Sequence, residues 1–263
     1  MRFFKSWLPV LACLLFVPGA ASALEISNAE LVRIGERIFA NECAGRVECL
    51  ASWNEGEDFA SMGIGHFIWY PPGRRGPFAE SFPALLTFMR HQGVALPISL
   101  DTPRPELPWT SRAEFLAAAQ SPEMLELYRF LAHTKPAQAL FMARRMERAL
   151  PRILAQADPD MHGRLQRRFE NVSRSGKGVY ALIDYVNFKG EGILASERYH
   201  GQGWGLLQVL EEMRDPRSPR VAVTEFAAAA EHVLTKRVAN APPERHEDRW
   251  LAGWLKRVRG YVD

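Results

Sequence analysis

The chain has 263 residues, of which 47% are hydrophobic and 24% charged, and its formal net charge is +3. This composition is typical of a globular protein with a substantial core, and the length suits one large domain or two small ones. The near balance of 33 basic and 30 acidic residues argues against electrostatic capture of nucleic acid, which needs a strongly basic surface.

Residues 1–23 have the pattern of a secretory signal. Arg2 and Lys5 precede an apolar run that ends at Pro18-Gly19, and a small-residue cleavage site follows at 21–23. The apolar run is too short to span a bilayer comfortably. We therefore expect cleavage after residue 23, no stable membrane insertion afterwards, and a periplasmic or secreted location. A lipoprotein processed at Cys13 is the alternative, and it would leave an unusually short apolar region.

Cleavage would also change the charge and the cysteine content. It removes two basic residues and no acidic ones, so the net charge falls from +3 to +1. It leaves Cys43 and Cys49, six positions apart in sequence. These two residues form either a local disulfide across a helix end or a pair of buried thiols, and export favours the disulfide.

The first predicted element is a helix from Asn28 to Glu42 or Cys43. Ser27-Asn28-Ala29-Glu30 has the spacing of a capping box, and apolar residues recur after it at helical intervals. Position 42 lies four residues after Ile38 and so falls on nearly the same apolar face, where burial would keep a carboxyl group protonated.

The rest of the chain is mostly helical in pattern. Residues 56–70 lack helical periodicity and predict a short, irregular β-hairpin or meander, and 71–77 is a Pro/Gly/Arg loop. Helices are expected at about 82–90, 112–120, 122–133, 136–156, 164–172, 179–188, 203–214, 224–240 and 247–260. The predicted fold is one α+β domain over residues 24–263, predominantly α-helical, with a small β element after its first helix.

Acidic residues near the end of the first helix could cleave a glycosidic bond. That reaction needs a protonated carboxylic acid for the leaving oxygen and a second group at the anomeric carbon. Glu42 fits the first role, and Glu48, Glu55, Glu57 and Asp58 are candidates for the second. For any one loop acid chosen alone, a solvated surface charge is the commoner outcome.

The segment from Glu42 to His66 resembles the catalytic core of phage-type lysozymes. There, a glutamate ends the first helix, and an acid precedes a Ser/Thr-x-Gly-Ile-Gly-His hairpin; here Glu55 stands six positions before Ser61, followed by Gly63-Ile64-Gly65-His66. The resemblance implies a lysozyme-like fold, with Glu42 as general acid, Glu55 as second carboxylate and Ser61 holding the attacking water. The loop is longer here, and the phage-type residues are usually Asp and Thr, so Glu57 is an alternative to Glu55.

A second group of polar and aromatic residues lies at 181–213. Sugar sites combine aromatic faces with amides and acids, and ligand sites favour loops on a rigid scaffold. This predicts substrate-binding roles for Asn187, Glu191, Gln202 and Trp204, although helical spacing also fits Trp204 as a core residue. The segment Gly205-Leu206-Leu207-Gln208 loosely resembles one found in goose-type lysozymes and transglycosylases.

His66 is assigned to the substrate-binding set, although a hydrogen-bonded structural histidine is the commoner case. No metal site is predicted, because no HExxH or CxxC pattern is present. An arginine-rich segment at 144–148, with Arg164, Arg167 and Arg168, would either steer the protein toward anionic polymers or form a solvated helix face.

Together these features predict an exported glycoside hydrolase that cleaves peptidoglycan or a related amino-sugar polysaccharide without metal or organic cofactor. One alternative is a non-catalytic cell-envelope glycan-binding protein on a lysozyme-like fold, in which Glu42 would be exposed or salt-bridged. The other is a lytic transglycosylase, which forms an intramolecular anhydro product and needs only one glutamate.

Overall fold

The computed structural model describes residue 24 and residues 26–263, so the predicted secretory signal lies outside the described part of the chain. The protein is mostly helical with two small antiparallel sheets, which confirms the predicted helix-dominated α+β class. Among the described residues, no helix is both long and apolar enough to cross a membrane.

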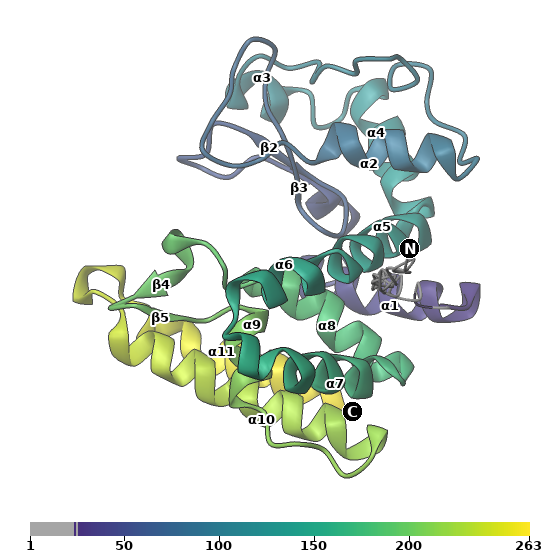
Figure 1. Ribbon diagram of the computed structural model, residues 1–263. Helices are drawn as coiled ribbons and strands as arrows, with labels where there is room; N and C mark the ends of the chain where they lie inside the picture. Colours follow the sequence, from purple (N-terminus) through teal and green to yellow (C-terminus); the bar gives the residue numbers. More distant parts are fainter. Residues whose placement is uncertain (1–23, 25) are drawn as a thin grey trace, which may run out of the picture.

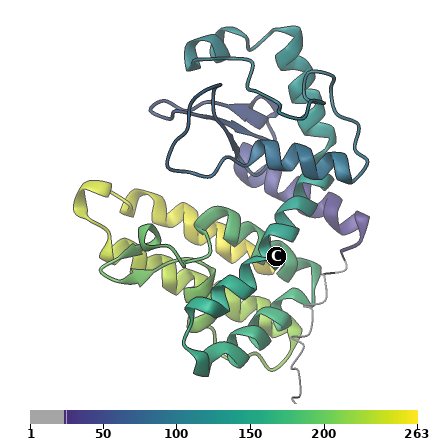
Figure 2. The same ribbon diagram turned by 45° about the horizontal axis from the view of Figure 1, so that its top comes forward.

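The chain forms two halves that meet at α1 (Asn28–Cys43) and α5 (Lys135–Glu147), as both views show (Figures 1 and 2). The sheet half, residues 47–133, contains β1 (Ala51–Ser52), β2 (Ala60–Met62), β3 (Phe67–Trp69), α2 (Phe82–His91), α3 (Arg112–Ala117) and α4 (Pro122–His133). The helical half, residues 149–263, contains α6 (Ala149–Gln156), α7 (His162–Ser173), α8 (Gly176–Lys189), β4 (Arg198–Tyr199), β5 (Gln202–Gly203), α9 (Leu206–Glu212), α10 (Pro219–Asn240) and α11 (Asp248–Arg259).

Helix α1 confirms the predicted bounds and cap. The Ser27 hydroxyl accepts from the Glu30 backbone N–H, and the Glu30 carboxylate accepts from the Ser27 N–H, which completes a capping box. The buried face of α1 packs mainly against α5 and also touches α8. The helix ends at Cys43, and Ala44 adopts the left-handed conformation with φ of 49°. The glutamate at position 42 is thereby placed where the two halves meet.

The small sheet has the order β1-β2-β3 and is antiparallel throughout. In β2, Ala60 and Met62 face the core and are fully buried, whereas Ser61 points to the opposite face. The register pairs Ser61 with Ser52 on one side and with Ile68 on the other. The second face of the sheet therefore presents two hydroxyl groups next to an aliphatic side chain.

The predicted helix over 136–156 is wrong as a single element, because the structure divides it into α5 and α6. The break follows from Pro151. A proline inside a helix has no N–H for the carbonyl four residues earlier and clashes with it, and α5 ends at residue 147. The predicted helix over 203–214 is also shorter than expected, since Gln202 and Gly203 form β5 before α9 begins.

Candidate active site around Glu42

The Glu42 carboxyl group belongs to a buried polar cluster. Arg257 of α11 donates from Nη2 to Glu42 Oε1, and from Nε and Nη2 to the two carboxylate oxygens of Asp184 on α8 at 2.8 Å each. The Tyr261 hydroxyl donates to Asp184 Oδ2 at 2.7 Å. The side chain of Glu42 is 16% exposed, whereas that of Asp184 is fully buried. Glu42 is therefore the carboxylate of this cluster that a ligand can reach.

The charges of the Glu42 cluster are unequal in number, because two carboxylates share one guanidinium. Burial works against the charge of Arg257, but Asp184 and Glu42 outweigh it and raise the Arg257 pKa above its ordinary value. Asp184 takes the two-point contact and Glu42 a single one. Glu42 is thus the more weakly held anion of the two.

A stack of alternating basic side chains and aromatic rings leads from Arg257 into the helical half. The Arg257 guanidinium lies 4.2 Å from the Phe188 ring centroid, and Lys189 Nζ lies between Phe188 and Trp254 at 3.9 and 3.2 Å. Arg237 continues the stack toward Trp204. The charged guanidinium groups of Arg257 and Arg237 are stabilised by their positions over the ring faces. The stack therefore holds Arg257, and through it the carboxylate of Glu42.

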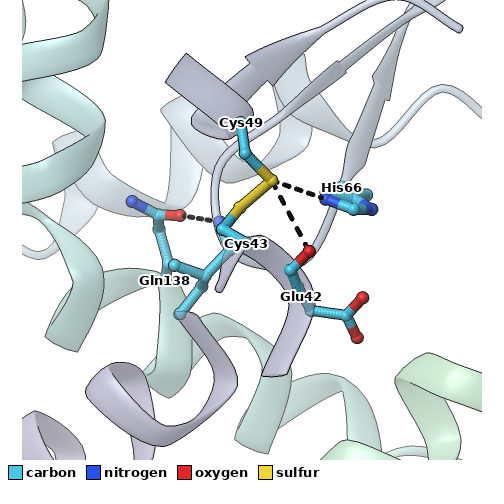
Figure 3. The surroundings of a disulfide bond; sticks show 6 residues. Glu42, Cys43, Cys49, His66 and Gln138 are labelled. Carbon is cyan, nitrogen blue, oxygen red and sulfur yellow. Dashed lines mark hydrogen bonds between the residues drawn. A yellow bond between two sulfur atoms is a disulfide. The ribbon is translucent and has the colours of Figure 1, made fainter. Parts of the chain in front are cut away.

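A disulfide between Cys43 and Cys49 fixes the chain directly after Glu42 (Figure 3). It confirms the disulfide that the sequence analysis favoured over two buried thiols. Cys49 Sγ lies 3.6 Å from the Glu42 carbonyl oxygen and 3.8 Å from His66 Nε2. The sulfur atoms of Cys43 and Cys49 and a ring nitrogen of His66 are close enough together to be metal ligands. Because metal binding needs thiolates, the disulfide removes both sulfurs from that role in this state. His66 is placed beside the helix end, as a structural neighbour of the disulfide.

The glycine turn between β2 and β3 is anchored by Gln138 of α5, which sequence analysis missed. Gln138 is fully buried; its Oε1 accepts from the Ile64 N–H at 2.8 Å, and its Nε2 donates to the Leu131 carbonyl. Gly63 has φ of +68°, and a Cβ there would lie 2.2 Å from Gln138 Oε1. The glycine therefore allows a close approach between the hairpin and helix α5.

The hairpin acids make no hydrogen bond or ion pair with the polar cluster in the described chain. Glu55 is exposed, and Glu57 is half-buried with its Oε2 accepting from Asn54 Nδ2 at 3.1 Å. Among the described residues, no hydrogen bond or ion pair joins either acid to Glu42. Ser61 is 5% exposed, and its hydroxyl makes no hydrogen bond within the described chain. Its oxygen is thus uncommitted on the second face of the sheet.

The downstream residues are divided between two places. Asn187 is half-buried on α8, one turn after Asp184, and so lies on the same side of that helix as the Glu42 cluster. Glu191 instead forms an ion pair with Arg152 of α6, with Nε to Oε2 at 2.9 Å. Of the four downstream candidates, Asn187 is therefore the one that shares a helix face with a member of the Glu42 cluster.

The other two downstream candidates have partners within the helical half. The Gln202 side-chain oxygen accepts from Asn240 at 3.0 Å. Trp204 is only 6% exposed, with its ring 4.5 Å from Tyr199 and 4.0 Å from the Arg237 guanidinium. This placement matches the core interpretation of Trp204, because both neighbours cover the ring that a sugar would need.

A hollow of about 490 Å³ adjoins the cluster and is lined by α1, α8 and α11. Its lining includes Arg257, Phe188, Asn41 and Tyr180. The volume is in the range of small-molecule sites, and the wall mixes aromatic rings with amide and cationic groups. The hollow can hold a polar ligand against Arg257, the partner of Glu42. In comparisons with known proteins, no family model, no curated protein and no solved structure matched the chain.

Proposed function

We propose that the protein is an exported glycosidase that cleaves peptidoglycan or a related amino-sugar polymer, with Glu42 as the proton donor. The observation that carries this proposal is a mostly buried glutamate in the last turn of the first helix, directly before the disulfide. Helix α1 lies where the sheet half and the helical half meet (Figure 1), which supports a role for its end in facing a chain-like substrate.

The proposed chemistry assigns a proton transfer to Glu42 and a water to the hairpin. A glycosidic oxygen bound beside Glu42 would take the place of the single Arg257 contact, while Asp184 keeps the guanidinium. Ser61 would orient the water, because its hydroxyl is uncommitted, and Glu55 or Glu57 would supply the second carboxylate. No metal or organic cofactor is needed for these steps.

A specific observation supports each of the two alternative functions. The ion pair between Glu42 and Arg257 favours a non-catalytic glycan-binding protein, because a carboxylate bound to a guanidinium already has a structural role. The exposed position of Glu55 favours a lytic transglycosylase, since formation of an anhydro product needs one glutamate only. The products formed from a glycan, or their absence, distinguish the three functions.

The decisive experiment measures release of reducing ends and product masses from purified peptidoglycan and from chitosan. Glu42→Gln is the test variant, and Glu36→Gln is the matched control on the same helix, where Glu36 is paired with Lys135 at 2.8 Å. We expect cleavage by the wild type and the control, and loss of at least about a hundredfold in rate for Glu42→Gln. Anhydro products would identify the transglycosylase. Binding without cleavage by the wild type would contradict the enzymatic proposal.

A second pair of variants tests the hairpin acids in the same assay. If Glu57 supplies the second carboxylate, Glu57→Gln lowers the rate while the exposed Glu55→Gln retains it, and the reverse holds for Glu55. Full activity in both variants would exclude Glu55 and Glu57 from the reaction.

A further inference from the structure

A second hollow lies in the sheet half, and no residue of the Glu42 cluster lines it. It has a volume of about 870 Å³ and lies between the β3–α2 loop and the α2–α3 connection. We call it the arginine pocket, after the residues that define it: Arg74, Arg75, Arg104, Phe78, Glu80 and Glu106. The Glu42 cluster, by contrast, draws its other members from α8, from α11 and from the turn after α11, all in the helical half (Figures 1 and 2).

The loop that carries Arg74 and Arg75 is fastened to the end of β3. The Tyr70 N–H donates to Glu80 Oε1 at 2.9 Å, and the Tyr70 hydroxyl donates to the Phe78 carbonyl at 3.4 Å. Gly76 packs so closely that a Cβ there would lie 2.5 Å from the Tyr70 hydroxyl. Because Tyr70 is itself 6% exposed, these contacts attach the loop to the core. The two arginines are therefore presented from a supported loop.

The arginine pocket carries a small excess of positive charge. Arg74, Arg75 and Arg104 are exposed, and no side-chain hydrogen bond or ion pair holds them within the described part of the chain. The wall has two acids, Glu80 and Glu106. Glu80 accepts a hydrogen bond from the Tyr70 N–H. Three guanidinium groups against two carboxylates give the wall a net positive charge. Guanidinium groups bind carboxylates through two parallel hydrogen bonds, so an anion fits this wall.

An aromatic ring stands beside the three cations. Phe78 is 59% exposed, and its ring centroid is 5.9 Å from that of Phe59, which in turn packs against Tyr70 at 5.6 Å. An exposed ring supported from behind offers an apolar face to one side of a pyranose. A ligand that satisfies both the ring and the cations carries a sugar ring and an acid group together.

We propose that the arginine pocket binds a carboxylate-bearing sugar chain at a site separate from Glu42. The sugar face packs on Phe78, and the carboxylates accept from Arg74, Arg75 and Arg104. The site captures an acidic polysaccharide whether or not Glu42 cleaves one, so it goes beyond the proposed function and does not depend on it.

The test is calorimetric titration of the protein with trigalacturonate, with its methyl ester as the uncharged probe and with tripolyphosphate as an anion lacking a sugar. We expect trigalacturonate to bind, more weakly as salt increases, and the ester and tripolyphosphate to bind at least about tenfold more weakly. Equal binding of the ester would overturn the role of the arginines. Equal or tighter binding of tripolyphosphate would overturn the sugar specificity.

Variants localise the binding. Arg74→Ala, Arg75→Ala and Arg104→Ala should each weaken it about tenfold, the effect of losing one charge-assisted hydrogen bond. Glu106→Gln should tighten it severalfold, because it removes an anion from the wall. Arg129→Ala, at an exposed arginine of α4 in the same half of the protein, is the matched control and should bind like the wild type. Unchanged affinity in all three pocket variants, or equal weakening in Arg129→Ala, would refute the proposal.

Discussion

Replacement of Lys189 by methionine should stabilise the protein, and more at pH 7 than at pH 9. Lys189 is 8% exposed, and its Nζ lies 3.2 Å from the Trp254 ring centroid without a carboxylate bound to it in the described chain. Burial lowers the pKa of this amine from the usual 10.5 to about 6, and repulsion from Arg237 acts in the same direction. Glu247 opposes the shift.

The sign of the pH dependence follows from where the proton is bound. Between pH 6 and 10.5 the unfolded chain holds a proton on Lys189 that the folded chain lacks, so the free energy of unfolding rises with pH across this window. The slope is up to about 1.4 kcal/mol per pH unit. With the folded pKa at about 6, the penalty is about 5 kcal/mol at pH 7 and about 2 kcal/mol at pH 9. Methionine fills similar space without this penalty.

Urea denaturation followed by tryptophan fluorescence at pH 7 and pH 9 measures both values, with the disulfide kept intact. Lys256→Met is the matched control, because Lys256 is exposed on α11. The difference in stability between Lys189→Met and wild type should shrink by about 3 kcal/mol between the two pH values. A difference that is independent of pH, or a variant less stable than wild type, would refute the buried neutral amine.

Three further changes test the supports of the site. Gly63→Ala should destabilise the protein by about 3 kcal/mol in urea unfolding, because φ is +68° and the new Cβ would meet Gln138; a neutral result would contradict that close contact. Replacing both Cys43 and Cys49 by serine should cost about 2 kcal/mol, given the short loop, and an unchanged melting temperature would disprove this. Asp184→Asn should lower the free energy of unfolding by about 3 to 5 kcal/mol, because the buried guanidinium of Arg257 loses its two-point carboxylate partner. A free energy of unfolding within about 1 kcal/mol of the wild-type value, by the same urea assay, would contradict this role of Asp184.

The sequence predicted the features that depend on neighbouring residues. The capping box of Ser27 and Glu30, the bounds of α1 and the Cys43–Cys49 pair all follow from groups a few positions apart. The break between α5 and α6 was equally local, because Pro151 removes the hydrogen bond to the residue at which α5 ends. It was missed because the apolar pattern continues across it.

The residues around Glu42 could not be found in this way. Arg257 is 215 positions from Glu42 and 73 from Asp184, and no short motif marks the pairing of such residues. Gln138 is likewise 74 positions from the Ile64 N–H that it binds. A buried polar group needs a partner, but the sequence does not say which distant element supplies it.

The sequence by itself determined a helix-dominated chain with a glutamate at the end of its first helix, a disulfide directly after it and a glycine-rich turn. Hydrophobic periodicity, capping and chain breaks are short-range properties, so these features could be read without coordinates. Only the tertiary structure decided that Glu42 meets Arg257 and Asp184, and that Trp204 lies in the core. Those outcomes depend on which helices pack together, and packing is set by the whole set of buried surfaces rather than by local pattern.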